Sequence, residues 1–225
     1  MEKVYKGVHV VIGIIRSIFF NLRVLPLKKA IKLPIIISPF VKLKSLKGEI
    51  KIENSEIKFG MIKIGYGDVG IFDRVFSRTI FQINGEIKFL GKANIGHGSK
   101  ISVGSKGKLI LGENFEITAQ TEIICHKKIT FGKNVLISWD NLIMDVDFHK
   151  IYISGSNKQI NNSKEIEVED NVWIGCRNTI LKGSKIKKGS IVGANSVIVH
   201  EFQEENILIV GNPAQIKKRN IYWEK

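Results

Sequence analysis

The sequence predicts an all-β protein whose main part is a parallel coil of short strands stacked on one another. Beyond residue 45 the chain consists of short, glycine-punctuated strands such as GEIKIEN, GEIKFLG and GKLILG. Aliphatic residues then recur at every sixth position, and helical periodicity is absent until the last dozen residues. A period of six fits neither an α-helix, with about 3.6 residues per turn, nor a flat strand, whose period is about two.

The clearest repeat occupies residues 168–198. Its aliphatic anchors are Val168, Ile174, Ile180, Ile186, Val192 and Ile198. Serines stand two residues before three of these anchors, each preceded by glycine or asparagine, in the pairs Gly183 and Ser184, Gly189 and Ser190, and Asn195 and Ser196. We expect each anchor to point to the axis of a flat-sided coil and each Gly or Asn to adopt a corner backbone that other residues avoid. Stacked coils would then bury a continuous apolar column.

An earlier block keeps the same step. Its anchors are Ile95 and Ile101, followed by Leu111, Ile117, Ile123, Ile129 and Val135. From Val135 the step continues weakly to Asn141 and Asp147, and it resumes at Val168. The interval from 147 to 168 is 21 residues, which is no multiple of six. We therefore expect residues 150–165, rich in Ser, Asn and Gly, to be extruded as a loop.

The coil domain is expected at residues 45–210, between an N-terminal segment (1–44) and a closing segment (211–225) that ends in a short helix. The stretch GVHVVIGIIRSIFFNLRVL predicts a helix whose apolar surface is interrupted by Arg16 and Arg23. It is too short and too charged to span a bilayer comfortably. Two interpretations stay open for it: an amphipathic helix on an anionic membrane, or a cap packed on the main body or on a partner subunit.

Composition narrows the class of partner. A hydrophobic fraction of 44% in 225 residues excludes a disordered chain. The net charge of +14 favours an acidic partner such as a phosphorylated cofactor or an anionic membrane, although a lysine-rich coding bias would give the same excess. No nucleic-acid-binding motif accompanies the charge, so nucleic acid is not expected. The two cysteines suggest no disulfide framework, and we expect a cytoplasmic protein.

Three stretches resemble one known family. ITFGKNVLISWDNLIMDVDFH, VEDNVWIGCRNTILKGSKIKKGSIVGANSVIV and GNPAQIKK are similar to segments of the hexapeptide-repeat acyltransferases, whose fold is a left-handed parallel β-helix. The nearest resemblance is to sugar O-acetyltransferases of the galactoside and maltose acetyltransferase type, and to their relatives in capsule and O-antigen synthesis. It covers about residues 90–220, and the left hand of the coil is implied by the resemblance alone.

The resemblance makes His149 in MDVDFH the expected catalytic residue. Histidine can remove a proton from an acceptor hydroxyl near neutral pH, as a general base must. Asp145 and Asp147 share a face with His149 if the segment is extended, and one of them is expected to orient the imidazole, preferably Asp147. A backbone N–H at a coil corner would stabilise the oxyanion. The expected reaction is direct acetyl transfer from acetyl-CoA to a sugar hydroxyl in surface polysaccharide synthesis.

The resemblance also implies a cofactor path along the C-terminal coils, between two subunits of a homotrimer. The implied acetyl-CoA contacts are Trp173, Cys176, Ala194, Val199, His200, Lys217 and Lys218. Two positions depart from the family pattern, because Cys176 replaces a small polar residue and Gln215 replaces a basic one. On the acceptor side, Thr118 occupies the place where close relatives have an asparagine. The saccharide acceptor is thus not named by the sequence, and neither is the length of the acyl chain.

Other interpretations remain. An N-acetyltransferase acting on a nucleotide-linked amino sugar is the main alternative, and a non-catalytic β-helix scaffold is a weaker one. A zinc enzyme using His97, His126 and His149 is disfavoured because two histidines five residues apart are lacking, so no metal is expected. Cys125 is interpreted as buried packing rather than as a nucleophile. The apolar, basic N-terminus suggests a lipid-linked saccharide acceptor at the inner face of the membrane.

Overall fold

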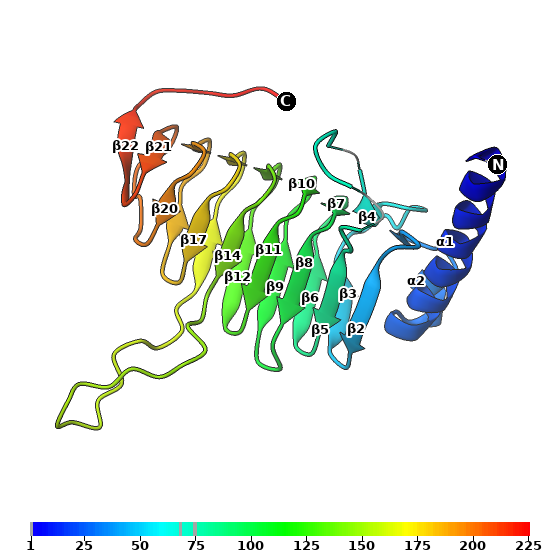
Figure 1. Ribbon diagram of the computed structural model, residues 1–225, viewed down its shortest axis with the longest axis horizontal. Helices are drawn as coiled ribbons and strands as arrows, with labels where there is room; N and C mark the ends of the chain where they lie inside the picture. Colours follow the sequence, from blue (N-terminus) through cyan, green and yellow to red (C-terminus); the bar gives the residue numbers. More distant parts are fainter. Residues whose placement is uncertain (1, 68, 74–75) are drawn as a thin grey trace.

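Three parallel sheets form the sides of a prism, which is a left-handed parallel β-helix (Figure 1). The computed structural model describes residues 2–67, 69–73 and 76–225. From β1 to β20 successive strands pass from one sheet to the next, so strands three places apart in the chain pair in parallel. The described helices lie at the N-terminal end, and a hairpin closes the other end.

We call the sheets A, B and C in the order in which the chain enters them. Sheet A holds β1 (Ile35–Ile37), β4 (Ile62–Tyr66), β7 (Ala93–His97), β10 (Phe115–Ala119), β13 (Leu136–Ile137), β16 (Trp173–Ile174), β19 (Ile191–Val192), β21 (Leu208–Gly211) and β22 (Ala214–Lys218). Sheet B holds β2 (Lys42–Leu46), β5 (Ile80–Ile83), β8 (Lys100–Val103), β11 (Glu122–Cys125), β14 (Leu142–Met144), β17 (Thr179–Leu181) and β20 (Val197–Ile198). Sheet C holds β3 (Glu49–Ile52), β6 (Glu86–Phe89), β9 (Lys108–Leu111), β12 (Lys128–Phe131), β15 (Ile166–Val168) and β18 (Lys185–Ile186).

The six-residue repeat over residues 168–198 has the structure that its pattern predicts. All six aliphatic anchors of this block are fully buried along the axis of the prism. Gly183, Gly189 and Asn195 have φ values of 82°, 68° and 56°, in the left-handed region that favours Gly and Asn. Ser196 at such a corner is buried, and its Oγ donates to the carbonyl of Gly193 at 2.8 Å. The corners thereby satisfy polar groups next to an apolar core.

The register between residues 135 and 147 differs from the prediction. Ile137 and Ile143 are the buried anchors of β13 and β14, and they pair with the anchors of the preceding coil. Asn141 and Asp147, which the six-residue step would place in this register, lie at corners instead. The physical reason is that β12 buries two side chains, Ile129 and Phe131, and the six-residue step continues from Phe131, as it continues from Leu111 to Ile117 on the preceding coil.

Helix α1 (Glu2–Val24) and the short helix α2 (Leu27–Ala30) form the expected helical segment at the N-terminus. The coil then begins at β1, ten residues earlier than the boundary expected at residue 45. The face of α1 that meets the prism buries Phe20 against Phe81 and also makes polar contacts. The Asn21 amide donates to the Ile35 carbonyl at 2.6 Å, and the Ser17 Oγ accepts from the Ile37 N–H at 2.9 Å. These bonds cover the outer edge of sheet A. No helix in the described part of the chain is long and apolar enough to cross a membrane.

The expectation of a short C-terminal helix is wrong. Strands β21 and β22 form an antiparallel hairpin, and the chain then runs back along the prism as an extended tail (Figure 1). Residues outside the tail hold it in place. Arg219 pairs with Glu204 at 2.6 Å, and the Trp223 Nε1 donates to the Asn171 carbonyl at 2.8 Å. Contacts with the prism therefore replace the hydrogen bonds that a helix would have made within the tail.

Candidate active site

The chain leaves the prism between β14 and β15, as the irregular spacing of the repeat suggests. Residues 145–165 project from the corner between sheets B and C, with an isolated bridge between Tyr152 and Gln159 (Figure 1). His149 lies on the outgoing arm of this loop, close to its base, and its side chain is exposed. The loop thus places one imidazole on the edge of the prism where sheets B and C meet.

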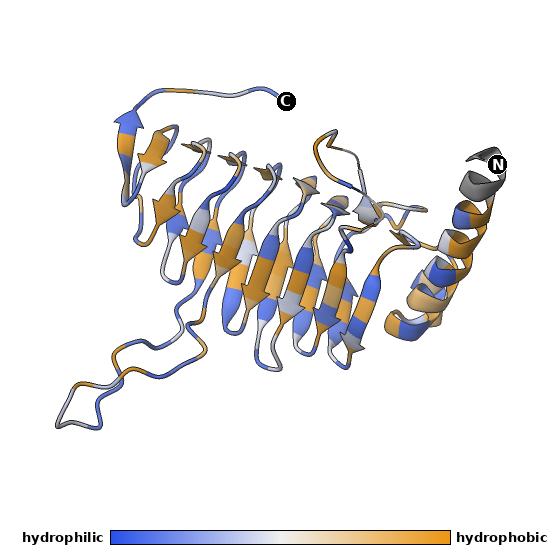
Figure 2. Cartoon of the chain, viewed as in Figure 1, coloured by the Kyte–Doolittle hydropathy of each residue, from blue (hydrophilic) through white to orange (hydrophobic). Residues whose placement is uncertain are grey.

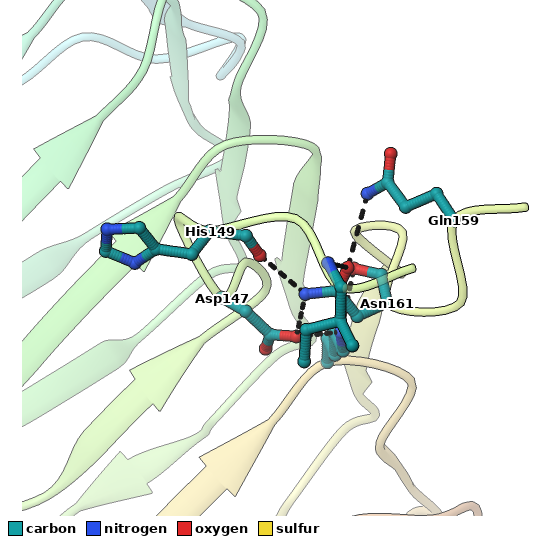
Figure 3. Close-up of polar contacts among 6 residues, drawn as sticks. Asp147, His149, Gln159 and Asn161 are labelled. Atoms are coloured by element: carbon teal, nitrogen blue, oxygen red, sulfur yellow. Dashed lines mark hydrogen bonds and ion pairs between the residues drawn. The ribbon is translucent and has the colours of Figure 1, made fainter. Parts of the chain in front are cut away.

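Three side chains, Asp147, Asn161 and Lys182, close the base of the loop, and we call them the loop clasp. The Asn161 Nδ2 donates to the Asp147 carboxylate at 2.9 Å and to the His149 carbonyl at 2.6 Å, and its Oδ1 accepts from the Ile151 N–H at 2.7 Å (Figure 3). The Lys182 ammonium pairs with Asp147 and donates to the Asn161 carbonyl at 3.0 Å. The ion pair with Lys182 and the Asn161 amide hold the pKa of the Asp147 carboxyl below its usual range.

The His149 imidazole points away from Asp147 and Asn161 (Figure 3). Within one chain, no described residue forms a hydrogen bond with this ring, so the expected orienting contact with Asp147 is not made there. The preceding residue, Phe148, has a φ of 61°, which is uncommon for a bulky side chain. Such a backbone conformation tends to persist where the surrounding structure holds it, often at functional sites.

Asp145 has a different role from the one expected for it. Its carboxylate is fully buried and accepts the backbone N–H groups of His126 at 2.7 Å and of Lys127 at 2.8 Å. Those amides lie at the corner of the preceding coil, so Asp145 ties two neighbouring corners together. Because its acceptors are used on these buried bonds, Asp145 is a structural residue rather than a partner of His149.

His126 is a neighbour of the site that sequence reasoning did not place there. It follows β11 at the same corner where Asp145 follows β14, one coil further along. Its ring contacts that of Phe148, with centroids 5.1 Å apart and planes at 79°. The signal in the sequence was its position just after a sheet B strand, which puts its side chain on the His149 edge.

Two of the expected cofactor residues lie on the same edge. Val199 and His200 follow β20, and β14, β17 and β20 are adjacent in sheet B, so the strands that lead to His149 and Val199 are about 10 Å apart. Val199 and His200 line a cavity of about 700 Å³ together with residues of the closing hairpin, including Pro213 and Ile216. This volume falls within the range of about 300–1,000 Å³ that is common for small-molecule sites. Lys217 and Lys218 are exposed next to it on β22.

The remaining expected residues lie elsewhere on the prism. Thr118 and Trp173 are in sheet A, and Cys176 and Ala194 are at the corner between sheets A and B. The Trp173 Nε1 donates to the Ser138 Oγ at 3.2 Å, and its ring lies 6.1 Å from that of Trp223. One chain therefore divides the expected site residues between two edges, with sheet B between them.

Cys125 is fully buried on β11, and burial raises the pKa of its thiol to about 12. A thiol in this state does not supply a thiolate nucleophile. His97 lies on β7 in sheet A, apart from His126 and His149 on the other edge. Over residues 2–67, 69–73 and 76–225, no group of three or more His, Cys, Asp or Glu side chains could hold a metal ion.

The fold is that of the acyltransferases built on a left-handed β-helix. The family described as bacterial transferase hexapeptide (six repeats) matches residues 165–200. The chain is 31% identical over 204 residues to an uncharacterized 24.8 kDa protein in the cps region of Klebsiella pneumoniae, covering 90% of this chain and 86% of the relative. It is 34% identical over 125 residues to the polysialic acid O-acetyltransferase of Escherichia coli O1:K1 / APEC, covering 55% of this chain and 40% of that enzyme.

A third relative is the putative lipopolysaccharide biosynthesis O-acetyl transferase WbbJ of Escherichia coli K12, which is 28% identical over 154 residues. That match covers 63% of this chain and 78% of the relative. Among solved structures, the polySia specific acetyltransferase NeuO has a TM-score of 0.51 at 23% identity, covering 85% of this chain and 84% of that one, and this likeness shows the fold. The chain belongs to the hexapeptide-repeat acyltransferases, and an acyl-CoA is its implied acyl donor.

Proposed function

We propose that the protein transfers an acetyl group from acetyl-CoA to a sugar hydroxyl in the synthesis of a surface polysaccharide, with His149 as the general base. One observation carries this proposal. The exposed His149 imidazole lies on the same edge of the prism as the cavity at Val199 and His200. The names of the relatives, a polysialic acid O-acetyltransferase and a putative lipopolysaccharide O-acetyl transferase, support an O-linked sugar acceptor.

Acetyl transfer to a hydroxyl requires one proton acceptor beside the acceptor oxygen. Acetyl-CoA supplies the acyl group as a thioester. His149 takes the proton from the acceptor hydroxyl while the oxygen forms a bond to the acyl carbon, and it returns that proton to the sulfur when the carbon–sulfur bond breaks. Proton and electron pairs balance without a further reactant. The exposed lysines at 217 and 218 are suited to the phosphates of the donor, since both are cationic and next to the cavity.

We also propose that the complete site forms between subunits of a homotrimer. Sheet B separates the edge that carries His149, Val199 and His200 from the corner that carries Cys176 and Ala194. Two edges of one prism cannot face each other across one cofactor. A neighbouring copy, placed by a threefold axis, would bring its Cys176 and Ala194 corner against the His149 edge.

Peripheral contact with an anionic membrane on the cytoplasmic side is the last part of the proposal. Helix α1 exposes an apolar stripe formed by Val11, Ile15, Ile18, Phe19 and Leu22. From residue 3 to residue 48 the chain has ten Lys and Arg residues and no Asp or Glu. An apolar helix face flanked by cations is typical of helices that lie in the interface of anionic lipids. A lipid-linked saccharide would meet the enzyme at such a surface.

Replacement of His149 tests the catalytic proposal. His149→Ala should lower kcat by about 10²–10⁴-fold, the usual contribution of a positioned general base, while binding of acetyl-CoA stays unchanged. Thiol release from acetyl-CoA measures turnover, and equilibrium dialysis measures binding. His126→Ala is the matched control, since it removes an imidazole from the same edge and should leave turnover close to that of the wild type. Normal turnover of His149→Ala would reject the assignment.

A panel of acceptors, assayed with acetyl-CoA, distinguishes O-acetylation from N-acetylation. Oligosaccharides of sialic acid and of neutral hexoses offer only hydroxyls, whereas nucleotide-linked amino sugars offer an amine. We expect acetyl esters, which mild base removes, on a hydroxyl acceptor. A base-stable amide on an amino sugar, with no ester formed from any saccharide, would establish the N-acetyltransferase instead.

A further inference from the structure

Two cavities adjoin where helix α1 rests on the N-terminal end of the prism. The first, of about 460 Å³, lies between α1 and β1, and the second, of about 420 Å³, lies on the side of β2. They share Pro39 and Phe40 as a common wall. Neither belongs to the acyltransfer edge, because both are formed by residues of the N-terminal segment and the first coils.

The first cavity is apolar, and we call it the chain cavity. Its lining is His9, Val10, Gly13, Ile14, Ser17, Leu33, Ile36, Ser38, Pro39, Phe40, Phe59 and Tyr66. Gly13 helps to leave it open, since a Cβ built there would lie 3.5 Å from Pro39 and 3.5 Å from the Tyr66 hydroxyl, inside the cavity but without a clash. The volume is within the range of small-molecule sites, and an apolar lining suits a hydrocarbon chain.

The second cavity is cationic, and we call it the head cavity. It is lined by Arg16, Lys42 and Arg78 around Pro39, Phe40, Val41 and Leu43. Among the residues that the structure describes, no acidic side chain lines either cavity. The Arg16 guanidinium donates to the Val41 carbonyl, while its buried Nε has no hydrogen-bond partner among the described residues. A buried cationic donor without a partner is costly, and an anion with several acceptor oxygens would satisfy it.

We propose that the two cavities together bind one molecule of a phosphate-bearing membrane lipid. Its phosphate lies in the head cavity, on Arg16, Lys42 and Arg78, and one hydrocarbon chain lies in the chain cavity beneath α1. The two cavities adjoin at Pro39 and Phe40, as the phosphate and the hydrocarbon chain of a lipid are joined in one molecule. This inference rests on the proposed membrane contact and is independent of the acetyl-transfer chemistry.

The charge of this end of the molecule favours a lipid over a second copy of the chain. The apolar stripe of α1 is exposed, and α1 stands at the N-terminal end of the prism with hydrophobic residues along it (Figure 2). Every charged residue from 3 to 48 is a cation. Two copies that met through these helices would bring like charges together. An anionic lipid surface instead offers both opposite charge and hydrocarbon.

A chain-length series of soluble phosphatidylglycerols tests the site below their micelle-forming concentrations. Each added methylene that leaves water should strengthen binding about fourfold. Because the chain cavity is finite, the gain should stop once it is full. Titration calorimetry on the full chain gives the affinities. A gain that continues without a plateau, or no saturable binding at any length, would overturn the proposal.

Variants separate the two cavities. Gly13→Leu fills the chain cavity and improves helix propensity, so it should fold normally and bind the longest soluble lipid at least about 50-fold more weakly, the equivalent of three methylenes. Lys42→Gln with Arg78→Gln should lose the preference for phosphatidylglycerol over phosphatidylcholine. The matched control, Lys32→Gln with Lys44→Gln, removes the same charge at the same end but outside both cavities, and should keep that preference.

Two further experiments distinguish a bound lipid from free phosphate and from adsorption to a membrane surface. Inorganic phosphate alone should bind far more weakly than the lipid, and it would replace the lipid in the proposal if it bound equally well. In flotation with phosphatidylglycerol vesicles, Ile15→Ser with Phe19→Ser should lose membrane docking yet keep binding of the soluble lipid. If Gly13→Leu bound lipid like the wild type while the stripe variant lost it, the site would be the helix surface and not the cavities.

Discussion

Asp145 and Asp147 show how two like residues, two positions apart, receive different roles from their surroundings. Asp145 is fully buried and caps two backbone N–H groups of the previous corner. Asp147 is partly exposed and joins the two arms of the loop through Asn161 and Lys182. Neither carboxylate contacts the His149 ring within the chain. The alternation along MDVDFH predicts that Asp145, Asp147 and His149 share one face. The corner instead directs the three side chains to different surroundings (Figure 3).

At the residue scale, Asp145→Ala should destabilise the protein without acting on the chemistry directly. It leaves two corner amides without an acceptor in a buried place, at a cost of about 3 kcal/mol. Asp145→Asn keeps one acceptor oxygen and should lose less. Urea unfolding at fixed protein concentration measures both, since assembly would contribute to stability. If Asp145→Ala kept full stability but lost turnover, Asp145 would belong to the catalytic set after all.

At the scale of elements, α1 departs from the usual amphipathic arrangement. Its inner face buries Phe20 against Phe81 but otherwise presents Gly13, Ser17 and Asn21 to the prism, while most of its large aliphatic side chains are exposed. A helix that only capped the prism would bury its apolar face. Polar residues lie on the inner face because an edge strand presents unpaired backbone groups, and Ser17 and Asn21 satisfy them. The large aliphatic side chains of the outer face are exposed, which is the basis of the proposed membrane contact.

The loop clasp makes a second prediction at this scale. Asp147→Asn should let the loop open more often, so that trypsin cleaves after Lys150, Lys158 or Lys164 roughly two- to fivefold faster, a modest effect because the pair is partly exposed. Glu169→Gln, which removes a carboxylate paired with Lys187 outside the loop, should leave the cleavage rate unchanged. Equal rates in both variants would show that the clasp does not hold the loop.

The pH dependence of the clasp follows from its pKa. The Asp147 carboxyl has a pKa below its ordinary value of 3.8, chiefly because of Lys182. The clasp is therefore fully held above that value and is lost only as the pH falls through the lower, folded-state pKa. Between pH 5 and 8 a change in activity does not come from Asp147. Pepsin cleavage of the loop should differ between the wild type and Asp147→Asn near pH 4 and converge at lower pH.

At the scale of the whole molecule, the prism separates residues that are expected to contact one cofactor. His149 and the Val199 cavity lie on one edge of sheet B, and Ala194 lies on the other. Because parallel coils make a rigid, continuous core, no bending of one chain brings these edges together. In the proposed trimer, a second copy completes the site.

Complementation between two inactive variants tests this arrangement. Ala194→Trp should block the cofactor path at one edge, and His149→Ala removes the base at the other. Co-expression of the two variants gives mixed trimers, in which each site takes its His149 edge from one subunit and its Ala194 edge from the next. Each of these edges is intact with a probability of one half, so about one quarter of the sites would have both edges intact. Thiol release should recover to about that fraction of the wild-type rate. If the mixed trimers stayed as inactive as either parent, each site would lie within one chain.

Much of the fold could be predicted from the sequence, because a six-residue period leaves few ways to bury its anchors. The buried column from Val168 to Ile198, the left-handed Gly and Asn corners and the helix at the N-terminus all follow from local pattern. The register at Ile137 and the extended tail could not be predicted in this way. The first depends on which of the two buried residues of β12, Ile129 or Phe131, starts the next six-residue step. The second depends on contacts of Arg219 and Trp223 with distant parts of the prism.

The candidate site, too, was predicted in part from the sequence and in part could not be. By itself the sequence determined that His149 stands at an interruption of the coil, since the broken period requires a loop there. Only the tertiary structure decided that Asp145 caps a corner, that Asp147 is paired with Lys182 rather than with the imidazole, and that His126 lies beside Phe148. The physical reason is that a coil corner sets side-chain directions through a few backbone angles, and those angles depend on neighbouring coils far away in the sequence.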